Sequence, residues 1–117
     1  IIIGNLTKDR QNPDLDPNEV KQFNTGNFSG KPTWNRSNAL IKFTRQEYKN
    51  RFTIISCGGI FTPEDAWQKI SLGANLVQLI TGMIYQGPQL IGQINYHLSQ
   101  KLSRDNLHLQ DLHNQTK

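Results

Sequence analysis

Three short apolar runs, at residues 1–3, 53–56 and 76–79, constrain the fold of this chain most strongly. Each run is continuous rather than alternating with polar residues, which is typical of a strand buried on both faces of a parallel sheet. About twenty residues separate the second and third runs, enough for one crossover helix. This rhythm predicts parallel strands, adjacent in chain order, with helices between them on one face.

The helix between the second and third runs has the clearest start signal. Thr62 is placed as its N-cap and Pro63 at its first position, and Asp65 stands three residues after Thr62, as in a capping box. Gly73 is placed to end this helix. The sequence therefore predicts a helix of about ten residues that connects two strands.

Two further helices and two irregular segments complete the predicted organisation. Apolar residues at helical spacing within residues 34–50, among basic ones, predict an amphipathic helix with a solvated cationic face. Leucine and isoleucine recur every fourth residue from 90 to 102 and predict a last helix. Residues 5–30 are rich in Asn, Asp, Gly and Pro and predict a long polar loop. The tail at residues 103–117 is polar and is expected to fray.

The length of the chain limits how these units can be arranged. With 117 residues it can hold at most one domain. A closed barrel of eight β/α units takes roughly 250 residues, so either the sheet is open or most of a barrel is missing. The chain also starts with Ile1 inside an apolar run, without Met, so we expect it to be a piece of a longer protein.

Charge and composition exclude several classes of protein. The net charge of +4 favours anionic partners without requiring nucleic acid. Six basic residues stand against one acid between residues 31 and 51, where we expect the wet face of a helix. No apolar run approaches the roughly 20 residues of a membrane span, so the composition predicts a soluble chain.

Titratable side chains give no separate site by spacing. The single cysteine, Cys57, excludes an intrachain disulfide, and its apolar neighbours favour packing over nucleophilic chemistry. The histidines lack metal-ligand spacing and are expected at the surface: His97, His108 and His113. The acidic group in the long loop is expected to be solvated rather than a cation site: Asp14, Asp16 and Glu19.

The ends of the three runs are the best candidates for chemistry, because ligands of parallel α/β folds meet the carboxyl ends of the strands. Asn5 follows the first run, Gly58-Gly59 the second and Thr81-Gly82 the third. Glycines leave backbone amides open to a phosphate. We expect the second and third strand ends to form one anion site, with a helix starting at residue 83 or 84.

Four blocks in fixed order carry a family resemblance: Gly-Asn-Phe-Ser-Gly-Lys-Pro at 26–32, Ile-Ile-Ser-Cys-Gly-Gly-Ile-Phe at 54–61, Gly-Ala-Asn-Leu-Val-Gln-Leu-Ile-Thr-Gly at 73–82 and Ile-Tyr-Gln-Gly-Pro at 84–88. Together they resemble the carboxyl-terminal part of the class 2, quinone-linked dihydroorotate dehydrogenases. The resemblance covers residues 1–102, which is well under half of a family member, and leaves residues 103–117 as a polar tail.

The resemblance implies an α/β fold formed by the last β/α units of a TIM (β/α)8 barrel, with FMN as cofactor. Members of this family oxidise dihydroorotate to orotate in pyrimidine synthesis and pass the electrons to a quinone. Their catalytic base is a Ser upstream of this segment, so we expect the chain alone to be inactive. The resemblance also implies attachment to the bacterial or mitochondrial inner membrane, through a missing amino-terminal region.

Site roles carried over by motif fall on seven positions. The cofactor positions are Gly4, Gly30, Gly59, Ile80 and Thr81, and the substrate positions are Asn5 and Leu6. No catalytic residue and no metal ligand is carried over. The sequence departs from the family where Gly4 replaces Thr or Ser, Leu6 replaces Thr, Ile80 replaces Tyr, and Ser56-Cys57 replaces Gly-Val. Backbone contacts to a phosphate survive these changes, whereas Leu6 leaves a substrate oxygen without its hydrogen bond.

Two alternatives remain beside this interpretation. Leu6 and Gly4 also fit a divergent FMN barrel that oxidises another small molecule. A basic open-sheet module that binds nucleic acid through residues 31–51 belongs to a different class, and it lacks interleaved aromatic residues and a recognisable motif. Only the first two interpretations predict a preceding half-barrel with a Ser base and a flavin-binding Lys.

Overall fold

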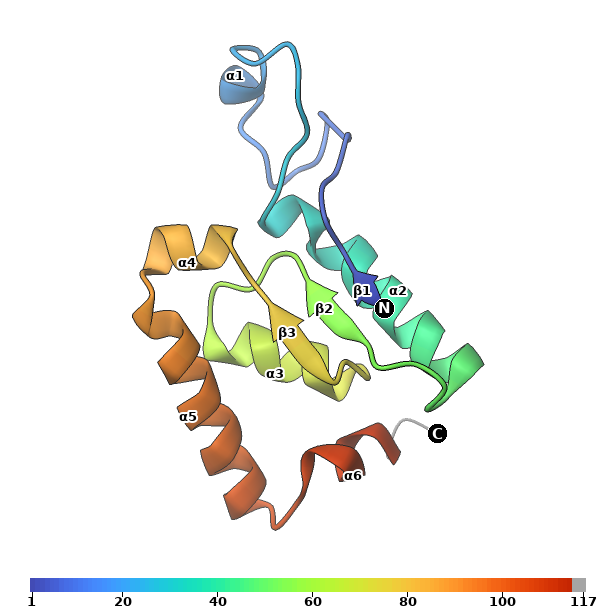
Figure 1. The fold of residues 1–117 in the computed structure, drawn as a ribbon. Coiled ribbons are helices and arrows are strands. Elements are labelled where there is room, and N and C mark those ends of the chain that lie inside the picture. The colour runs from blue at the N-terminus through green and yellow to red at the C-terminus, as the bar shows by residue number, and fades with distance from the viewer. Residues whose placement is uncertain (115–117) are drawn as a thin grey trace.

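The computed structural model describes residues 1–114 as a small parallel sheet with helices packed around it (Figure 1). In chain order the elements are β1 (Ile2–Ile3), α1 (Pro17–Val20), the 3₁₀ helix η1 (Lys31–Thr33), α2 (Trp34–Tyr48), β2 (Ile55–Cys57), α3 (Pro63–Ser71), β3 (Leu76–Gln78), α4 (Thr81–Gln86), α5 (Gln89–Arg104) and α6 (Leu109–Asn114).

The three strands pair in the order β1-β2-β3, and both pairings are parallel. Ile3 lies beside Ser56, and Ser56 beside Val77, so these residues share one face of the sheet. This confirms the predicted order and direction of the strands. Parallel direction follows from the crossovers, since each strand is followed by at least one helix before the chain re-enters the sheet.

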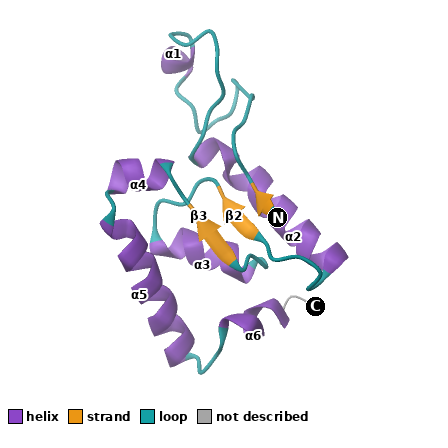
Figure 2. Ribbon diagram, viewed as in Figure 1, coloured by secondary structure: helices purple, strands orange, loops and turns teal. Residues whose placement is uncertain are grey.

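Only one face of the sheet is covered, contrary to the expectation of strands buried on both faces. Ile3 and Ser56 are 8% and 0% exposed beneath α2 and α3, which lie behind the strands in Figure 2. On the opposite face Ile2 and Leu76 are 61% and 56% exposed. The continuous apolar runs therefore provide more apolar surface than the described chain buries. Three strands are too few to close into a barrel, which would bury the second face of the sheet.

Helix α3 forms as the sequence predicts. The Thr62 hydroxyl accepts a hydrogen bond from the Asp65 amide at 3.1 Å, and the Asp65 carboxylate accepts one from the Thr62 amide at 3.0 Å. Two amide groups that the first turn leaves unpaired are thus satisfied. At the other end Gly73 has φ +119°, a conformation that favours glycine.

Helix α2 was predicted to have a solvated cationic face, but one of its basic residues, Arg45, is buried. This side chain is 3% exposed and donates two hydrogen bonds to the Gly73 carbonyl, at 2.9 and 2.7 Å, and one to Asn75 Oδ1 at 2.8 Å. Burial lowers its pKa from the usual range. Arg45 therefore fixes α2 to the turn between α3 and β3, a tertiary role that its helical spacing does not reveal.

The long loop and the tail both contain more structure than predicted. Within residues 5–30, Thr7 and Phe28 form an antiparallel bridge with backbone hydrogen bonds of 2.8 and 2.9 Å, and the segment projects from the body as an arm (Figure 1). In the tail, α6 brings Leu112 into the main core at 7% exposure. Leu112 packs into the core, and His113 contacts the Ala74 carbonyl, so α6 is docked rather than frayed as expected. Residues 115–117 lie outside the described part.

The hydrophobic core has two clusters on the covered side of the sheet. One lies around α2 and α3 and the other between α3 and α5, with Val77 and Leu98 in contact with both. Within residues 1–114 no helix combines the length and the hydropathy that crossing a membrane requires.

Candidate functional site

A hollow of about 220 Å³ opens where the carboxyl ends of the strands meet the loop that precedes η1. It is lined by Asn5, Leu6, Ser29, Gly30, Cys57, Gly58, Gly59, Ile60, Leu79, Ile80, Thr81 and Gly82. Six of the seven positions assigned from the resemblance are in this set; the seventh, Gly4, is not. Small-molecule sites usually measure roughly 300–1,000 Å³, and this hollow lies below that range.

Gly82 explains why the second and third strand ends converge. A Cβ atom added at Gly82 would lie 1.8 Å from the Ile60 carbonyl oxygen. The loop after β2 and the first turn of α4 therefore touch backbone to backbone, which only glycine allows here. Gly59, Thr81 and Gly82 consequently line one hollow, and that this hollow binds an anion stays a prediction.

Helix α4 begins at Thr81, two residues before the earlier of the two predicted starts. The Ile80 carbonyl already accepts a hydrogen bond from the Ile84 amide at 3.0 Å, so the first turn includes Thr81 and Gly82. Sequence reasoning placed the start later because Thr-Gly resembles a loop more than a helix.

The loop before η1 reaches the same hollow through Ser29 and Gly30. The hydroxyl oxygens of Ser29 and Thr81 lie 2.8 Å apart in a hydrogen bond. Gly30 has φ +81°, and a Cβ atom there would be 3.1 Å from Thr81 Cγ2. Ser29 was missed as a site residue, although it stands in the Ser-Gly-Lys-Pro block beside Gly30, which was the available signal.

The loop after β2 presents bare backbone. Gly58 and Gly59 have φ +98° and +76°, in the left-handed region that favours glycine. Behind them lie Thr33 and Trp34: a Cβ atom at Gly58 would be 2.3 Å from Thr33 Oγ1, and one at Gly59 3.0 Å from Trp34 Cβ. The start of α2 thus supports the loop from the side away from the hollow.

The end of β1 brings Asn5 and Leu6 to the hollow and leaves Gly4 behind it. A Cβ atom at Gly4 would be 2.2 Å from the Cys57 carbonyl oxygen, so this glycine permits contact between the ends of β1 and β2. Gly4 lines a neighbouring hollow of about 280 Å³, which Asn5 and Leu6 also reach. Leu6 is 50% exposed and Ile80 62% exposed, so both present apolar surface to whatever fills the site.

The hollow has a neutral lining. None of its lining residues in the described chain carries a carboxylate. The nearby Lys31 ammonium lies 5.4 Å from the centre of the Phe61 ring and 3.4 Å from an Asp65 carboxylate oxygen. The described lining therefore places no formally charged side chain in the hollow itself.

A second lysine near the site, Lys69, was missed by sequence reasoning. It is 0% exposed, its ammonium donates a hydrogen bond to Ser37 Oγ, and burial lowers its pKa to about 8. Its spacing could have indicated burial, because Lys69 falls three residues after Ala66 and next to Ile70, on the buried face of α3.

Other titratable groups differ in their distance from the hollow: Cys57 lines it, and Asp14, Asp16 and Glu19 line a neighbouring hollow of about 540 Å³ that shares Ser29, Gly30 and Thr81 with it. His113 is not a surface residue as expected: its Nε2 is 2.9 Å from the Ala74 carbonyl, and burial lowers its pKa. His97 contacts Glu64 at 3.0 Å across α3 and α5. Asp16 caps α1 by accepting a hydrogen bond from the Asn18 amide at 2.7 Å. Within residues 1–114 no group of three or more His, Cys, Asp or Glu residues has metal-binding geometry.

The sequence model of the family described as dihydroorotate dehydrogenase matches residues 1–102. The chain belongs to this family. Curated relatives include the quinone-type dihydroorotate dehydrogenases of Trichodesmium erythraeum, 51% identical over 82 residues (70% of this chain, 22% of the relative), and Rippkaea orientalis, 43% identical over 109 residues (89% and 29%). The mitochondrial enzyme of Arabidopsis thaliana is 41% identical over 105 residues (90% and 22%).

Solved structures of the family share the fold described here. The ligand-free dihydroorotate dehydrogenase of Eimeria tenella superimposes with a TM-score of 0.81 at 30% identity, covering 95% of this chain and 30% of its own. The ferulenol complex of the same enzyme gives 0.76 at 29% identity, with 95% and 29% covered. The described β/α units therefore correspond to a part of the dihydroorotate dehydrogenase barrel, and the chain spans between a fifth and a third of the length of these relatives.

Proposed function

We propose that this chain supplies part of the FMN phosphate site and one substrate-binding amide of a dihydroorotate dehydrogenase that reduces a quinone. The observation that carries the proposal is the single hollow shared by Asn5, Gly30, Gly59 and Thr81. These residues come from three strand ends and a loop, and positions 5 and 81 are far apart in sequence. Their convergence needs the same β/α arrangement as the family fold.

The residues around the hollow suit a phosphate. Gly30 and Gly59 have no side chains, so their amides are open to an approaching anion, and the neutral lining does not repel one. The hydrogen-bonded hydroxyl pair of Ser29 and Thr81 adds two groups that can reorient toward phosphate oxygens. A neutral peptide-lined cradle of this kind favours an anion through backbone dipoles rather than through a formal charge.

On the substrate side, Asn5 is the residue of this chain best placed to bind. Its amide both donates and accepts, which matches the adjacent N–H and C=O groups of a pyrimidine ring. Bound FMN would supply the chemistry by accepting a hydride from dihydroorotate. The role of Asn5 is to orient the ring, and that of Gly59 and Thr81 is to hold the cofactor's phosphate. No residue of the hollow is assigned as the catalytic base, which the resemblance puts on an upstream Ser.

A chimera tests this proposal. Residues 1–102 would replace the matching segment of the full-length Rippkaea orientalis relative, with which this chain aligns over 109 residues. We expect the chimera to bind FMN and to oxidise dihydroorotate with a quinone as acceptor, and the 117-residue chain alone to give no turnover. A folded chimera that fails to retain FMN would refute the cofactor assignment. Turnover by the chain alone would refute the need for an upstream base.

A second candidate, an FMN barrel for another small molecule, is favoured by one observation. Leu6 lines the hollow at 50% exposure where the family has a hydrogen-bonding Thr. An apolar group at that point selects against a polar substrate edge. Comparison of kcat/KM for dihydroorotate between the chimera and its Rippkaea parent separates the two candidates, because only the second predicts a large loss in a chimera that still binds FMN.

We also propose that the complete protein associates with a membrane. Peripheral membrane contact and quinone access would come from an amino-terminal region of the complete protein, as the family resemblance implies. Fractionation of cells that express the chimera would place it with membranes if the Rippkaea portion carries that region.

A further inference from the structure

Lys69 is a fully buried cation without a carboxylate partner. It is 0% exposed, and within residues 1–114 it forms no ion pair. Its ammonium donates a hydrogen bond to Ser37 Oγ and lies 4.5 Å from the centre of the Trp34 ring. A hydroxyl group and an aromatic face are weak compensation for the lost hydration of an ammonium group, so burial of this lysine costs stability.

Both contacts of Lys69 belong to the first turn of α2, and that turn supports the strand-end glycines. A Cβ atom at Gly59 would lie 3.0 Å from the Cβ of Trp34, and one at Gly4 3.2 Å from the Cβ of Ser37. Ser37 Oγ in turn donates to the Trp34 carbonyl at 3.1 Å. The ammonium group therefore holds, from α3, the turn on which the loop after β2 rests.

We propose that Lys69 is a positioning residue for the anion-binding loop: its ammonium group holds Trp34 and Ser37 against the backbone at Gly59. The inference rests on the proposed function, because it gives the Lys69 ammonium a role at the proposed phosphate site. A cation attracts both the ring face of Trp34 and the lone pair of Ser37, and an uncharged side chain of similar length attracts neither. Since its surroundings are dry, the same charge also favours an anion in front of the loop.

This role makes anion binding depend on pH. Burial lowers the pKa of Lys69 to about 8, so the ammonium loses its proton between pH 7 and 9. The charged or titratable groups that face it are Cys57 on β2, Asp65 on α3 and Lys31 on η1. The phosphate of FMN is already doubly charged above about pH 7, so its own ionisation adds no trend in this range.

The test compares FMN dissociation constants, measured by quenching of flavin fluorescence, in the 117-residue chain and in the chimera. The variants are Lys69→Met, Lys69→Arg and, as a matched control, Lys42→Met, which removes the same charge from an exposed position of α2. We expect Lys69→Met to bind FMN about tenfold more weakly at pH 7 and Lys42→Met to bind it normally. The unmodified protein should lose a similar factor between about pH 7 and 9, and Lys69→Arg should not, because arginine keeps its charge.

Stability measurements separate this role from a purely structural one. Because Lys69→Met removes a poorly compensated buried charge, its Tm at pH 7 should be no lower than that of the unmodified protein. A structural lysine would lower Tm and FMN affinity together. Cys57→Ala, added to the unmodified and Lys69→Arg proteins, removes the thiol that faces Lys69, so that the pH comparison depends on position 69 alone.

Normal FMN affinity in folded Lys69→Met, or a pH profile that Lys69→Arg leaves unchanged, overturns the role of Lys69 while the proposed function stands. An unmodified chimera that folds and binds no FMN refutes the proposed function itself. If Lys69→Met does not fold, the pH comparison between the unmodified and Lys69→Arg proteins still gives the answer.

Discussion

At Gly82 the chain has no room for a side chain, and this contact joins the two loops of the candidate site. A Cβ atom would overlap the Ile60 carbonyl oxygen, which belongs to backbone and cannot rotate away. We predict that Gly82→Ala lowers the free energy of unfolding by about 2 kcal/mol and weakens FMN binding by the chimera. The matched control is Gly92→Ala on α5, where nothing lies within 4 Å and the change should stabilise the helix by about 0.5–1 kcal/mol. Equal effects of the two substitutions in urea unfolding would contradict the close contact.

Leu6 is the residue at which substrate choice can be tested. If the complete protein acts on dihydroorotate, Leu6→Thr in the chimera should raise kcat/KM about fivefold, the effect of one recovered neutral hydrogen bond of about 1 kcal/mol. If its substrate is less polar, the same change should add little activity toward dihydroorotate. High activity that does not change would show that Leu6 points away from the substrate, although it lines the hollow.

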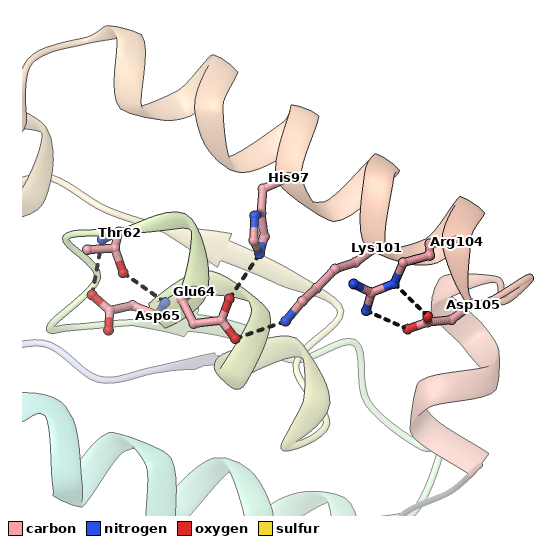
Figure 3. Close-up of polar contacts among 7 residues, drawn as sticks. All are labelled: Thr62, Glu64, Asp65, His97, Lys101, Arg104 and Asp105. Atoms are coloured by element: carbon pink, nitrogen blue, oxygen red, sulfur yellow. Dashed lines mark hydrogen bonds and ion pairs between the residues drawn. The ribbon is translucent and has the colours of Figure 1, made fainter.

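At the scale of elements, Glu64 links α3 to α5. Figure 3 shows its carboxylate between His97 and Lys101, at 3.0 and 2.9 Å. The same view shows the Thr62–Asp65 capping box and, at the end of α5, the pair of Arg104 with Asp105. The Lys101 ammonium also lies 4.6 Å from the centre of the Trp67 ring, so it contacts two residues of α3 from α5.

The link between α3 and α5 should depend on pH. The hydrogen bond from Lys101 is the main cause that lowers the pKa of Glu64 below its usual value of 4.5. The stabilisation is therefore present above about pH 4.5 and is lost as the pH falls through the lower folded-state value. The Glu64 side chain is 63% exposed, so we predict that Glu64→Gln costs only about 0.5 kcal/mol at pH 7, and nothing in strong acid. Glu47→Gln, at an exposed position of α2, serves as control; a loss that persists in acid would exclude the ion pair as its cause.

Local signals predicted elements well, and signals that depend on packing did not. Thr62, Pro63 and Asp65 define the start of α3 by contacts within one turn, so the sequence was sufficient there. Arg45 and Lys69 are buried by elements distant in sequence, and the charge of each side chain predicted exposure. The candidate site residues were assigned through motif order, whereas the contact of Ser29 with Thr81 joins residues 52 apart in sequence, which periodicity cannot predict.

At the scale of the whole molecule, the chain is more open than a closed domain of its length. Its radius of gyration is 15.3 Å, against roughly 13 Å for a compact chain of about this size. Ile2 and Leu76 are exposed on the bare face of the sheet, and β1 and β3 each have one edge without a paired strand in the described chain. Exposed apolar strands with free edges tend to associate, so we expect the 117-residue chain to self-associate and to unfold easily.

Lysine substitutions on that bare face test whether it becomes the interior of a barrel. In the 117-residue chain Ile2→Lys and Leu76→Lys place charge where the structure shows solvent, so the free energy of unfolding should change by less than about 0.5 kcal/mol and self-association should decrease. In the chimera the same residues would face the packed interior, where an unpaired lysine costs several kcal/mol. We therefore predict that each substitution leaves the short chain folded and prevents the chimera from folding, as measured by circular dichroism and FMN content. A chimera that tolerates both lysines would mean that no further strands cover this face, and the placement of the chain in a closed barrel would be wrong.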